Sequence, residues 1–267
     1  MSAAAPRVWI AVPARYQSSR FPGKPLTMLR GAGGAQKTLI QRAWEAAIAV
    51  PGVERVLVAT DDTRIEQAAQ AFGAEVAMTP ESCANGTERA AAVLNDAGAP
   101  PDIIVNLQGD APLTPPAFVT ALIEAMTADR EIAVATPVLA LDPEAIARFR
   151  SDRSQGRVGG TTAVLDAAGG ALYFSKEVLP YGADGVAVPA WHHVGVYAYR
   201  SDALRAYATL PVGLLEKAEG LEQLRFLENG FALQCVPVER GDGAFWEVNN
   251  PGDVAIVEAA LAARGLA

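Results

Sequence analysis

Short apolar runs alternate with longer amphipathic stretches through the first half of the chain. Apolar runs bounded by turn residues predict buried strands, and apolar residues spaced along one helical face predict helices. The predicted strands are Val8–Pro13, Arg55–Ala59, Glu75–Met78, Ile103–Leu107 and Ile132–Leu139. The predicted helices between them are Leu39–Val50, Thr63–Phe72, Thr87–Leu94 and Pro115–Ala128. This alternation predicts an α/β fold with a mostly parallel sheet flanked by helices on both faces.

The rhythm changes after about residue 143. Two short apolar segments flank Ala-Ala-Gly-Gly and predict a hairpin. The remaining predicted elements are the hairpin strands Val164–Asp166 and Ala171–Phe174, the strands Val194–Tyr199 and Phe231–Val238, and the helices Leu221–Leu227 and Val254–Ala263. We interpret residues 1–267 as one domain, with roughly 1–142 as a parallel half and 143–267 as an antiparallel lobe laid against it. The glycine-rich stretch Arg30–Lys37 is expected to be a flexible loop.

The charge and cysteine content exclude several classes of function. The formal net charge of −8 argues against nonspecific binding to nucleic acid or to an anionic membrane. Cys83 and Cys235 lack the spacing of a metal or redox motif, so we expect free thiols in a reducing cytoplasm. With only His192 and His193 in the chain, a histidine-based zinc site is not expected. Apolar stretches are too short for a membrane span or a signal-peptide core.

A basic loop follows the first predicted strand and carries Arg15, Arg20 and Lys24. The first fifty residues hold seven lysines and arginines against one acid, Glu45, although the whole chain is acidic. Loops after the first strand of an α/β sheet are common ligand sites, and clustered cations suit a polyanion such as a nucleoside triphosphate. The alternative is a solvated basic surface loop.

Asp110 comes just after the strand Ile103–Leu107, where a carboxylate is well placed to hold Mg²⁺ against bound phosphates. Gly109 would let the backbone approach a ligand closely. The alternative is an aspartate that only stabilises a turn.

Other polar residues are candidates for ligand binding or for structural roles. Thr87 is placed to cap the helix that begins there, where free N–H groups suit a ligand. Capping alone accounts for the presence of Thr87, but it does not account as readily for Arg89. Thr60, Asp61 and Asp62 are interpreted as the cap of the helix that follows them, Thr63–Phe72. In the strand HVGVYAYR, period-two alternation puts His193, Tyr197 and Tyr199 on one face, which suits recognition of a hydroxyl-rich ligand. The alternative is a partly buried histidine whose hydrogen bonds are satisfied by a neighbouring residue. Glu222 and Gln223 open a helix and either bind a polyol or form its first turn.

Together these segments resemble the 3-deoxy-manno-octulosonate (Kdo) cytidylyltransferases, also called CMP-Kdo synthetases. The stretches that carry the resemblance run in the family's order from about Val8 to Val254. They are PARYQSSRFPGKPL, VATDD, NGTER, NLQGDAP, VLDAAGGALYFSK, HHVGVYAYR, LEQLRFLENG and VNNPGDV. The resemblance implies a Rossmann-like nucleotide-diphospho-sugar transferase fold, a cytoplasmic homodimer, and a product used for lipopolysaccharide or capsule.

The implied reaction is attack of the sugar acid's anomeric hydroxyl on the α-phosphate of CTP, with Mg²⁺ as cofactor. The predicted catalytic residues are Arg15, Lys24 and Asp110. The predicted nucleotide-binding residues are Ala14, Arg15, Arg20, Lys24, Thr87, Arg89 and Gln108. The predicted residues for the sugar acid are Lys176, His193, Tyr197, Glu222 and Gln223. The predicted metal ligands are Asp110 and Asn249.

Four positions depart from the usual family pattern: Ala111 replaces a glutamate, Thr162 a lysine, Lys176 an arginine and Asn249 the aspartate that is the second metal ligand. An amide oxygen brings no charge to a metal, so Asp253, Glu247 or Asp242 is expected to compensate. The loop RGAGGAQK is also longer than usual. Because the changes lie around the metal and acid sites, the acceptor is open between Kdo and a related acid such as an amino-Kdo or another ulosonic acid. A nucleotide-binding paralogue without activity is a further alternative, and the missing GxGxxG disfavours an NAD(P)-dependent oxidoreductase.

Overall fold

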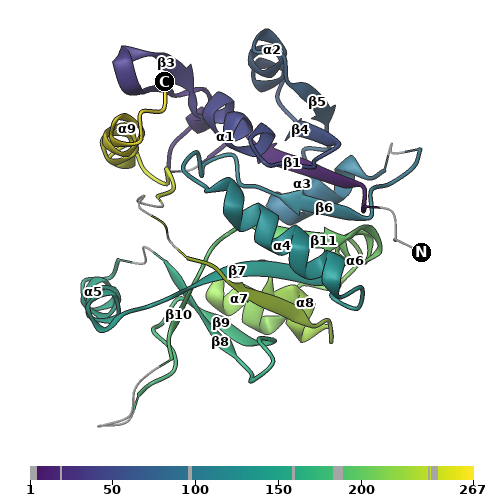
Figure 1. The fold of residues 1–267 in the computed structure, drawn as a ribbon, viewed down its shortest axis with the longest axis vertical. Helices are drawn as coiled ribbons and strands as arrows, with labels where there is room; N and C mark the ends of the chain where they lie inside the picture. Colours follow the sequence, from purple (N-terminus) through teal and green to yellow (C-terminus); the bar gives the residue numbers. More distant parts are fainter. Residues whose placement is uncertain are drawn as a thin grey trace.

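A ten-stranded mixed sheet forms the centre of the molecule (Figure 1). The structure, a computed structural model, describes residues 5–18, 20–95, 98–157, 160–182, 189–239, 241 and 246–267. The main-sheet strands are β1 (Val8–Ala14), β4 (Arg55–Thr60), β5 (Glu75–Met78), β6 (Ile103–Asn106), β7 (Val134–Ala140), β8 (Thr161–Leu165), β9 (Ala171–Ser175), β10 (Trp191–His193), β11 (Tyr197–Arg200) and β12 (Leu233–Pro237). Their order is β5-β4-β1-β6-β11-β7-β10-β8-β9, with β12 also paired to β7.

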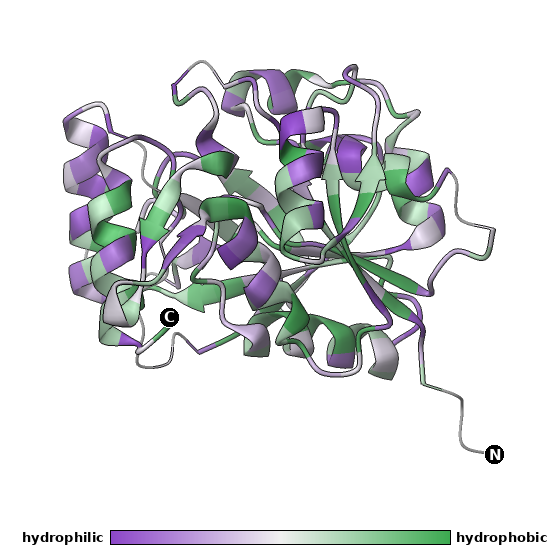
Figure 2. Ribbon diagram, turned by 90° about the horizontal axis from the view of Figure 1, so that it is seen from above, coloured by the Kyte–Doolittle hydropathy of each residue, from purple (hydrophilic) through white to green (hydrophobic). Residues whose placement is uncertain are grey.

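Helices cover both faces of this sheet (Figure 1). The helices of the described residues are α1 (Leu39–Ile48), α2 (Thr63–Ala71), α3 (Gly86–Val93), α4 (Pro116–Ala128), α5 (Pro143–Ser154), α6 (Ser201–Tyr207), α7 (Leu214–Glu219), α8 (Leu224–Glu228) and α9 (Asp253–Ala263). Strand β1 is buried along its whole length, as its unbroken apolar run predicts. Val8, Ile10 and Val12 pack with α1, α2 and α4 on one face of the sheet. Trp9 and Ala11 pack with α3 on the other face. In Figure 2 the central strands are correspondingly hydrophobic, and the helices carry hydrophilic residues on their outer sides.

The predicted fold class is confirmed. Strands β5, β4, β1 and β6 are parallel, and the first-half strands and helices match their predicted bounds within two residues. In the second half β11 is antiparallel to β6 and β7, and β8 forms antiparallel pairs with β9 and β10. These strands are hydrogen-bonded into the same sheet as the parallel ones.

The predicted strand Val194–Tyr199 is wrong in one respect, because it is broken at Gly195. The backbone N–H of Val196 donates to the carbonyl oxygen of Val194 at 2.7 Å, which is a tight turn. The hydroxyl of Thr136 donates to the carbonyl oxygens of both valines, at 3.1 and 2.9 Å. His193 therefore ends β10, while Tyr197 begins β11.

The expectation of a flexible loop at Arg30–Lys37 is also wrong. A two-stranded antiparallel hairpin, β2 (Met28–Arg30) and β3 (Gln36–Thr38), encloses the short 3₁₀ turn η2 (Ala32–Gly34). Gly33 closes that turn with a φ of 66°, a conformation that glycine adopts without strain. Helix α9 packs on this hairpin (Figure 1), and the cluster formed there includes Leu29, Val248 and Val257.

The two cysteines are free, as expected. Within the described ranges, none of the helices combines the length and the apolar character that a membrane crossing requires.

Candidate active site

The basic loop after β1 is folded back on itself and holds Lys24 in a fixed position. The N–H of Gly23 donates to the carbonyl oxygen of Tyr16 at 3.0 Å, and a φ of 71° at Gly23 turns the chain into the 3₁₀ turn η1 (Lys24–Leu26). From there the ammonium of Lys24 lies 2.6 Å from Oδ2 of Asp110 and 2.9 Å from the carbonyl oxygen of Val248. Three segments far apart in the sequence therefore meet at one lysine.

Asp110 lies at the carboxyl end of β6, directly beside the end of β1. Gly109 makes this approach possible, because a Cβ at this position would lie 2.5 Å from the carbonyl oxygen of Pro13. The carbonyl oxygen of Asp110 accepts a hydrogen bond from the N–H of Val248 at 2.9 Å. The structure thus brings the basic loop and the carboxylate after β6 together, as an ion pair that the sequence did not predict.

Two adjoining cavities open at this edge of the sheet. The smaller, about 280 Å³, is lined by most of the predicted nucleotide-binding residues: Ala14, Arg15, Arg20, Lys24, Arg89, Gln108 and, beside them, Asp110. The larger, about 970 Å³, is lined by all five predicted acid-binding residues and by Asn249. Arg20, Ala84, Asn85, Gln108 and Glu222 line both cavities. Ligands bound in the two cavities would therefore share these residues as neighbours.

Thr87 is the one predicted binding residue that is not among the residues lining either cavity. It is 1% exposed, and its hydroxyl donates to Oε1 of Glu222 at 2.8 Å and lies 3.0 Å from the hydroxyl of Tyr199. The predicted cap is also corrected, because Asn85 caps α3 by accepting a hydrogen bond from the N–H of Glu88 at 2.8 Å. The side chain of Thr87 instead fixes the orientation of Glu222.

Arg89 is buried and its charge is already paired. Its guanidinium donates to Oδ2 of Asp61 at 3.1 Å and to the hydroxyl of Thr79. Asp62 accepts a hydrogen bond from the N–H of Arg64 at 2.9 Å and caps α2, which confirms the structural interpretation of that segment. Arg15 and Arg20, by contrast, are exposed at the rim of the smaller cavity.

His193, Tyr197 and Tyr199 form a continuous aromatic row although they belong to two strands. The ring centroids of His193 and Tyr197 are 5.4 Å apart, and those of the two tyrosines are 5.9 Å apart. Burial lowers the pKa of His193 to about 3, so the imidazole is neutral, and its Nδ1 lies 3.0 Å from the hydroxyl of Thr161. Nε2 of His193 and Nε2 of Gln223 are buried and have no hydrogen-bond partner among the described residues. Such atoms in a cavity wall suit hydrogen bonds to a ligand.

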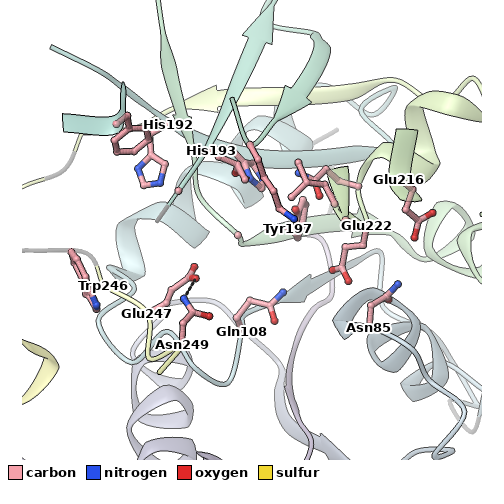
Figure 3. Close-up of a pocket in the computed structure, with 18 of the residues that line it drawn as sticks. Asn85, Gln108, His192, His193, Tyr197, Glu216, Glu222, Trp246, Glu247 and Asn249 are labelled. Carbon is pink, nitrogen blue, oxygen red and sulfur yellow. Dashed lines mark hydrogen bonds between the residues drawn. The ribbon is translucent and has the colours of Figure 1, made fainter. Parts of the chain in front are cut away.

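Two carboxylates of the larger cavity have raised pKa values. Burial raises the pKa of Glu222 to about 6, against hydrogen bonds from Thr87 and the Gly86 N–H. Burial and the negative charge of Asp110 raise the pKa of Glu247 to about 7, partly offset by Asn249 and Lys24. Figure 3 shows Glu247, Asn249 and Gln108 on one wall of the cavity and His193 and Tyr197 on the facing wall.

A largely buried ion-pair network in the wall of the larger cavity was not predicted. Arg225 donates to both carboxylate oxygens of Glu216, at 2.8 and 2.7 Å, and to Glu88 at 2.9 Å. The network ties α7, α8 and α3 together and so fixes the turn that carries Glu222 and Gln223. The charges in LLEKAEG and LEQLR were the available signal, but their partners are remote in the sequence.

A sequence model described as cytidylyltransferase matches residues 9–234. A 3-deoxy-manno-octulosonate cytidylyltransferase from Maricaulis maris is 44% identical, with 97% of this chain and 98% of that protein covered. The chain belongs to the Kdo cytidylyltransferase family. An 8-amino-3,8-dideoxy-manno-octulosonate cytidylyltransferase from Shewanella pealeana is 39% identical over 95% of this chain and 98% of that protein. The solved structure of a CMP:2-keto-3-deoxy-manno-octonic acid synthetase complexed with CTP superposes with a TM-score of 0.85 at 37% identity, covering 97% of this chain and 99% of that chain.

Two departures from the family pattern have a structural basis in this cytidylyltransferase. The hydroxyl of Thr162 donates to the carbonyl oxygen of Glu177 at 2.7 Å and accepts from the N–H of Leu179 at 3.2 Å, so it ties down the segment after β9. Ala111 is 1% exposed and packs where a carboxylate would lose its hydration. Lys176 lines the larger cavity, and Asn249 lies beside Glu247, with Nδ2 3.5 Å from Oε2.

Proposed function

We propose that this cytidylyltransferase transfers the cytidylyl group of CTP to the anomeric hydroxyl of Kdo, forming CMP-Kdo and releasing pyrophosphate. The observation that carries the proposal is the pairing of Lys24 and Asp110 at 2.6 Å in the smaller of two adjoining cavities. The smaller cavity suits the triphosphate, and the larger suits an acidic sugar. This assignment of substrates is supported by the relative from Maricaulis maris, which is named for 3-deoxy-manno-octulosonate, and by the similar solved synthetase, which is complexed with CTP.

In this proposal, Arg15, Arg20 and Lys24 neutralise the triphosphate. Catalysis of such a transfer depends mainly on position and charge, because the protein itself forms no covalent bond to the substrate. The anomeric oxygen forms a bond to the α-phosphorus as the bond from that phosphorus to the bridging oxygen breaks. Gln108 and Glu222, which line both cavities, are placed to contact both substrates.

Mg²⁺ is proposed as the cofactor, and the donor set fits it. Asp110 offers a carboxylate and Asn249 an amide oxygen, and Mg²⁺ prefers oxygen ligands. When bound, the ion would neutralise phosphate charge and polarise the α-phosphate. Lys24 holds Oδ2 of Asp110 and so fixes the direction of that carboxylate.

On the acid side, the unpartnered Nε2 atoms of His193 and Gln223 are proposed to hydrogen-bond sugar hydroxyls. Lys176 is proposed to pair with the sugar carboxylate, and Tyr197 to pack against the sugar ring. Because the imidazole of His193 is neutral, it can hydrogen-bond without adding charge to the cavity.

A second candidate acceptor is an 8-amino-Kdo. Relatives from Shewanella at 39% identity carry that name, and the carboxylates of Glu222 and Glu247 in the larger cavity would suit an ammonium group. The higher identity to the Maricaulis enzyme favours Kdo.

The experiment that tests the proposal measures pyrophosphate release from CTP and Mg²⁺ with Kdo, 8-amino-Kdo and other ulosonic acids. ATP, GTP and UTP serve as nucleotide controls, and omission of Mg²⁺ tests the cofactor. Turnover with CTP and Kdo alone supports the first candidate, and turnover with CTP and the amino sugar supports the second. No turnover with any acid, while CTP still binds, would refute both.

We further propose a homodimer in the cytoplasm, with residues 1–142 serving the nucleotide and 143–267 the acid and the dimer contact. The family resemblance supports the dimer and the division of labour. Analytical ultracentrifugation of the full chain checks the oligomeric state.

A further inference from the structure

The segment 246–249 joins the candidate metal site to the end of the chain. Val248 is fully buried in the cluster beneath α9, and its N–H and carbonyl oxygen are bound by the Asp110 backbone and by Lys24. Its neighbours Glu247 and Asn249 both line the larger cavity. The backbone hydrogen bond between Val248 and Asp110 therefore brings this segment next to Asp110, which lines the adjoining smaller cavity.

The family resemblance implies an aspartate at the position of Asn249, and the amide there brings no negative charge. Asp253 does not replace it, because both of its oxygens are used within its own turn. Oδ2 accepts from the N–H groups of Asn249 and Asn250 at 2.8 and 2.7 Å, and Oδ1 accepts from the indole of Trp246 at 3.2 Å. Asp242 lies outside the described residues.

Glu247 is in the right place to supply the charge. The amide nitrogen of Asn249 lies 3.5 Å from its Oε2, and the charges of Asp110 and Lys24 both act on it. A Cβ at Gly195 would lie 3.5 Å from Oε1 of Glu247, so the carboxylate extends across the cavity toward the turn between β10 and β11. Figure 3 shows Glu247 and Asn249 together, with Gln108 beside them.

We propose that Glu247 supplies the carboxylate that Asn249 lacks, so that Asp110 and Glu247 together hold the divalent cation, with the amide oxygen of Asn249 as a neutral ligand. This inference rests on the proposed metal dependence. Two carboxylates that lie near one another repel, and a divalent cation bound by both removes that repulsion. Glu247 and Asn249 are two residues apart, and both line the larger cavity.

The test measures Mn²⁺ affinity by electron paramagnetic resonance with CTP present and no sugar acid, so it does not depend on turnover. Glu247→Gln should weaken Mn²⁺ binding by about tenfold or more, because affinity follows the number of charged ligands. The double variant Glu247→Gln with Asn249→Asp should recover most of that affinity. Glu131→Gln is the control, since this exposed carboxylate precedes β7 at the opposite end of the sheet and should bind Mn²⁺ as the wild type does.

Circular dichroism and thermal melts establish that each variant is folded. Wild-type Mn²⁺ affinity in Glu247→Gln would overturn the proposal, and so would a loss that Asn249→Asp fails to restore. A wild type that binds no Mn²⁺ beside CTP would also overturn it. Failure of the proposed function is separate, because it shows as absent pyrophosphate release with every acid while Mn²⁺ binding follows the pattern above.

Discussion

Replacing Lys24 by methionine separates the catalytic from the structural role of the loop lysine. Methionine keeps most of the alkyl chain but removes the ammonium that contacts Asp110 at 2.6 Å and the carbonyl oxygen of Val248 at 2.9 Å. The side chain of Lys24 is 15% exposed and that of Asp110 is 27% exposed, so water can reach the carboxylate once the lysine is gone. We therefore expect the free energy of unfolding to fall by only about 1–2 kcal/mol.

The catalytic cost should be larger. Removing one charged donor from a transferring group typically lowers kcat by about 10²–10³. This corresponds to about 3–4 kcal/mol of transition-state stabilisation. The two effects are measured separately, by pyrophosphate release at saturating CTP and by urea denaturation of the same preparation.

Lys37→Met is the matched control. Lys37 pairs with Glu45 at 2.9 Å, with side-chain exposures of 27% and 31%, and it is not among the residues lining either cavity. That variant should lose less than about 1 kcal/mol of stability and keep its kcat. A kcat for Lys24→Met within tenfold of the control, with both proteins folded, would refute the catalytic role of this lysine.

Three further predictions concern stability and the pH dependence of folding. Between pH 4.5 and about 6 the folded state binds more protons at Glu222 than the unfolded state does, so the free energy of unfolding falls as pH rises through this window. Glu222→Gln should remove about 2 kcal/mol of that fall, as measured by urea denaturation at several pH values. Arg225→Met leaves the carboxylates of Glu88 and Glu216 without their ion-pair partner and should lower the free energy of unfolding by about 3–5 kcal/mol in the same denaturation assay. A loss below about 1 kcal/mol would show that the network is dispensable for stability. Gly109→Ala should lower both the melting temperature and the activity, because its Cβ would lie 2.5 Å from the Pro13 carbonyl oxygen, while Gly98→Ala, with open space around it, should leave both unchanged.

The elements that the sequence predicted well are those whose own residues determine their burial. Strand β1 is apolar at every position and is buried at every position, so its pattern needs no knowledge of its neighbours. The break between β10 and β11 depends instead on the hydroxyl of Thr136, on another strand, which binds two carbonyl oxygens there. Helix α5 buries only Ala145, so no apolar stripe marks it in the sequence.

The candidate site residues divide in the same way, into those whose place follows from the local sequence and those whose contacts are with distant residues. Arg15, Lys24 and Asp110 were found because their loops lie at the ends of predictable strands, where ligands bind. The position of Thr87 was predicted but its contacts were not, since Glu222 is 135 residues away in the sequence. The choice of Glu247 over Asp253 likewise depends on which carboxylate a local turn has already used, and that is a property of the folded chain.

The hydrogen bond from Lys24 to Val248 spans 224 positions of the chain. The last strand of the main sheet, β12, ends at Pro237, and the last residue that lines the smaller cavity is Glu222, so neither depends on residues 246–267 for its own residues. The ammonium of Lys24 and the carboxylates of Asp110 and Glu247 come together only when the segment before α9 packs against the β2–β3 hairpin. A chain cut before residue 246 would therefore keep the residues that line the smaller cavity but would lack Glu247, Asn249 and the carbonyl oxygen that holds Lys24.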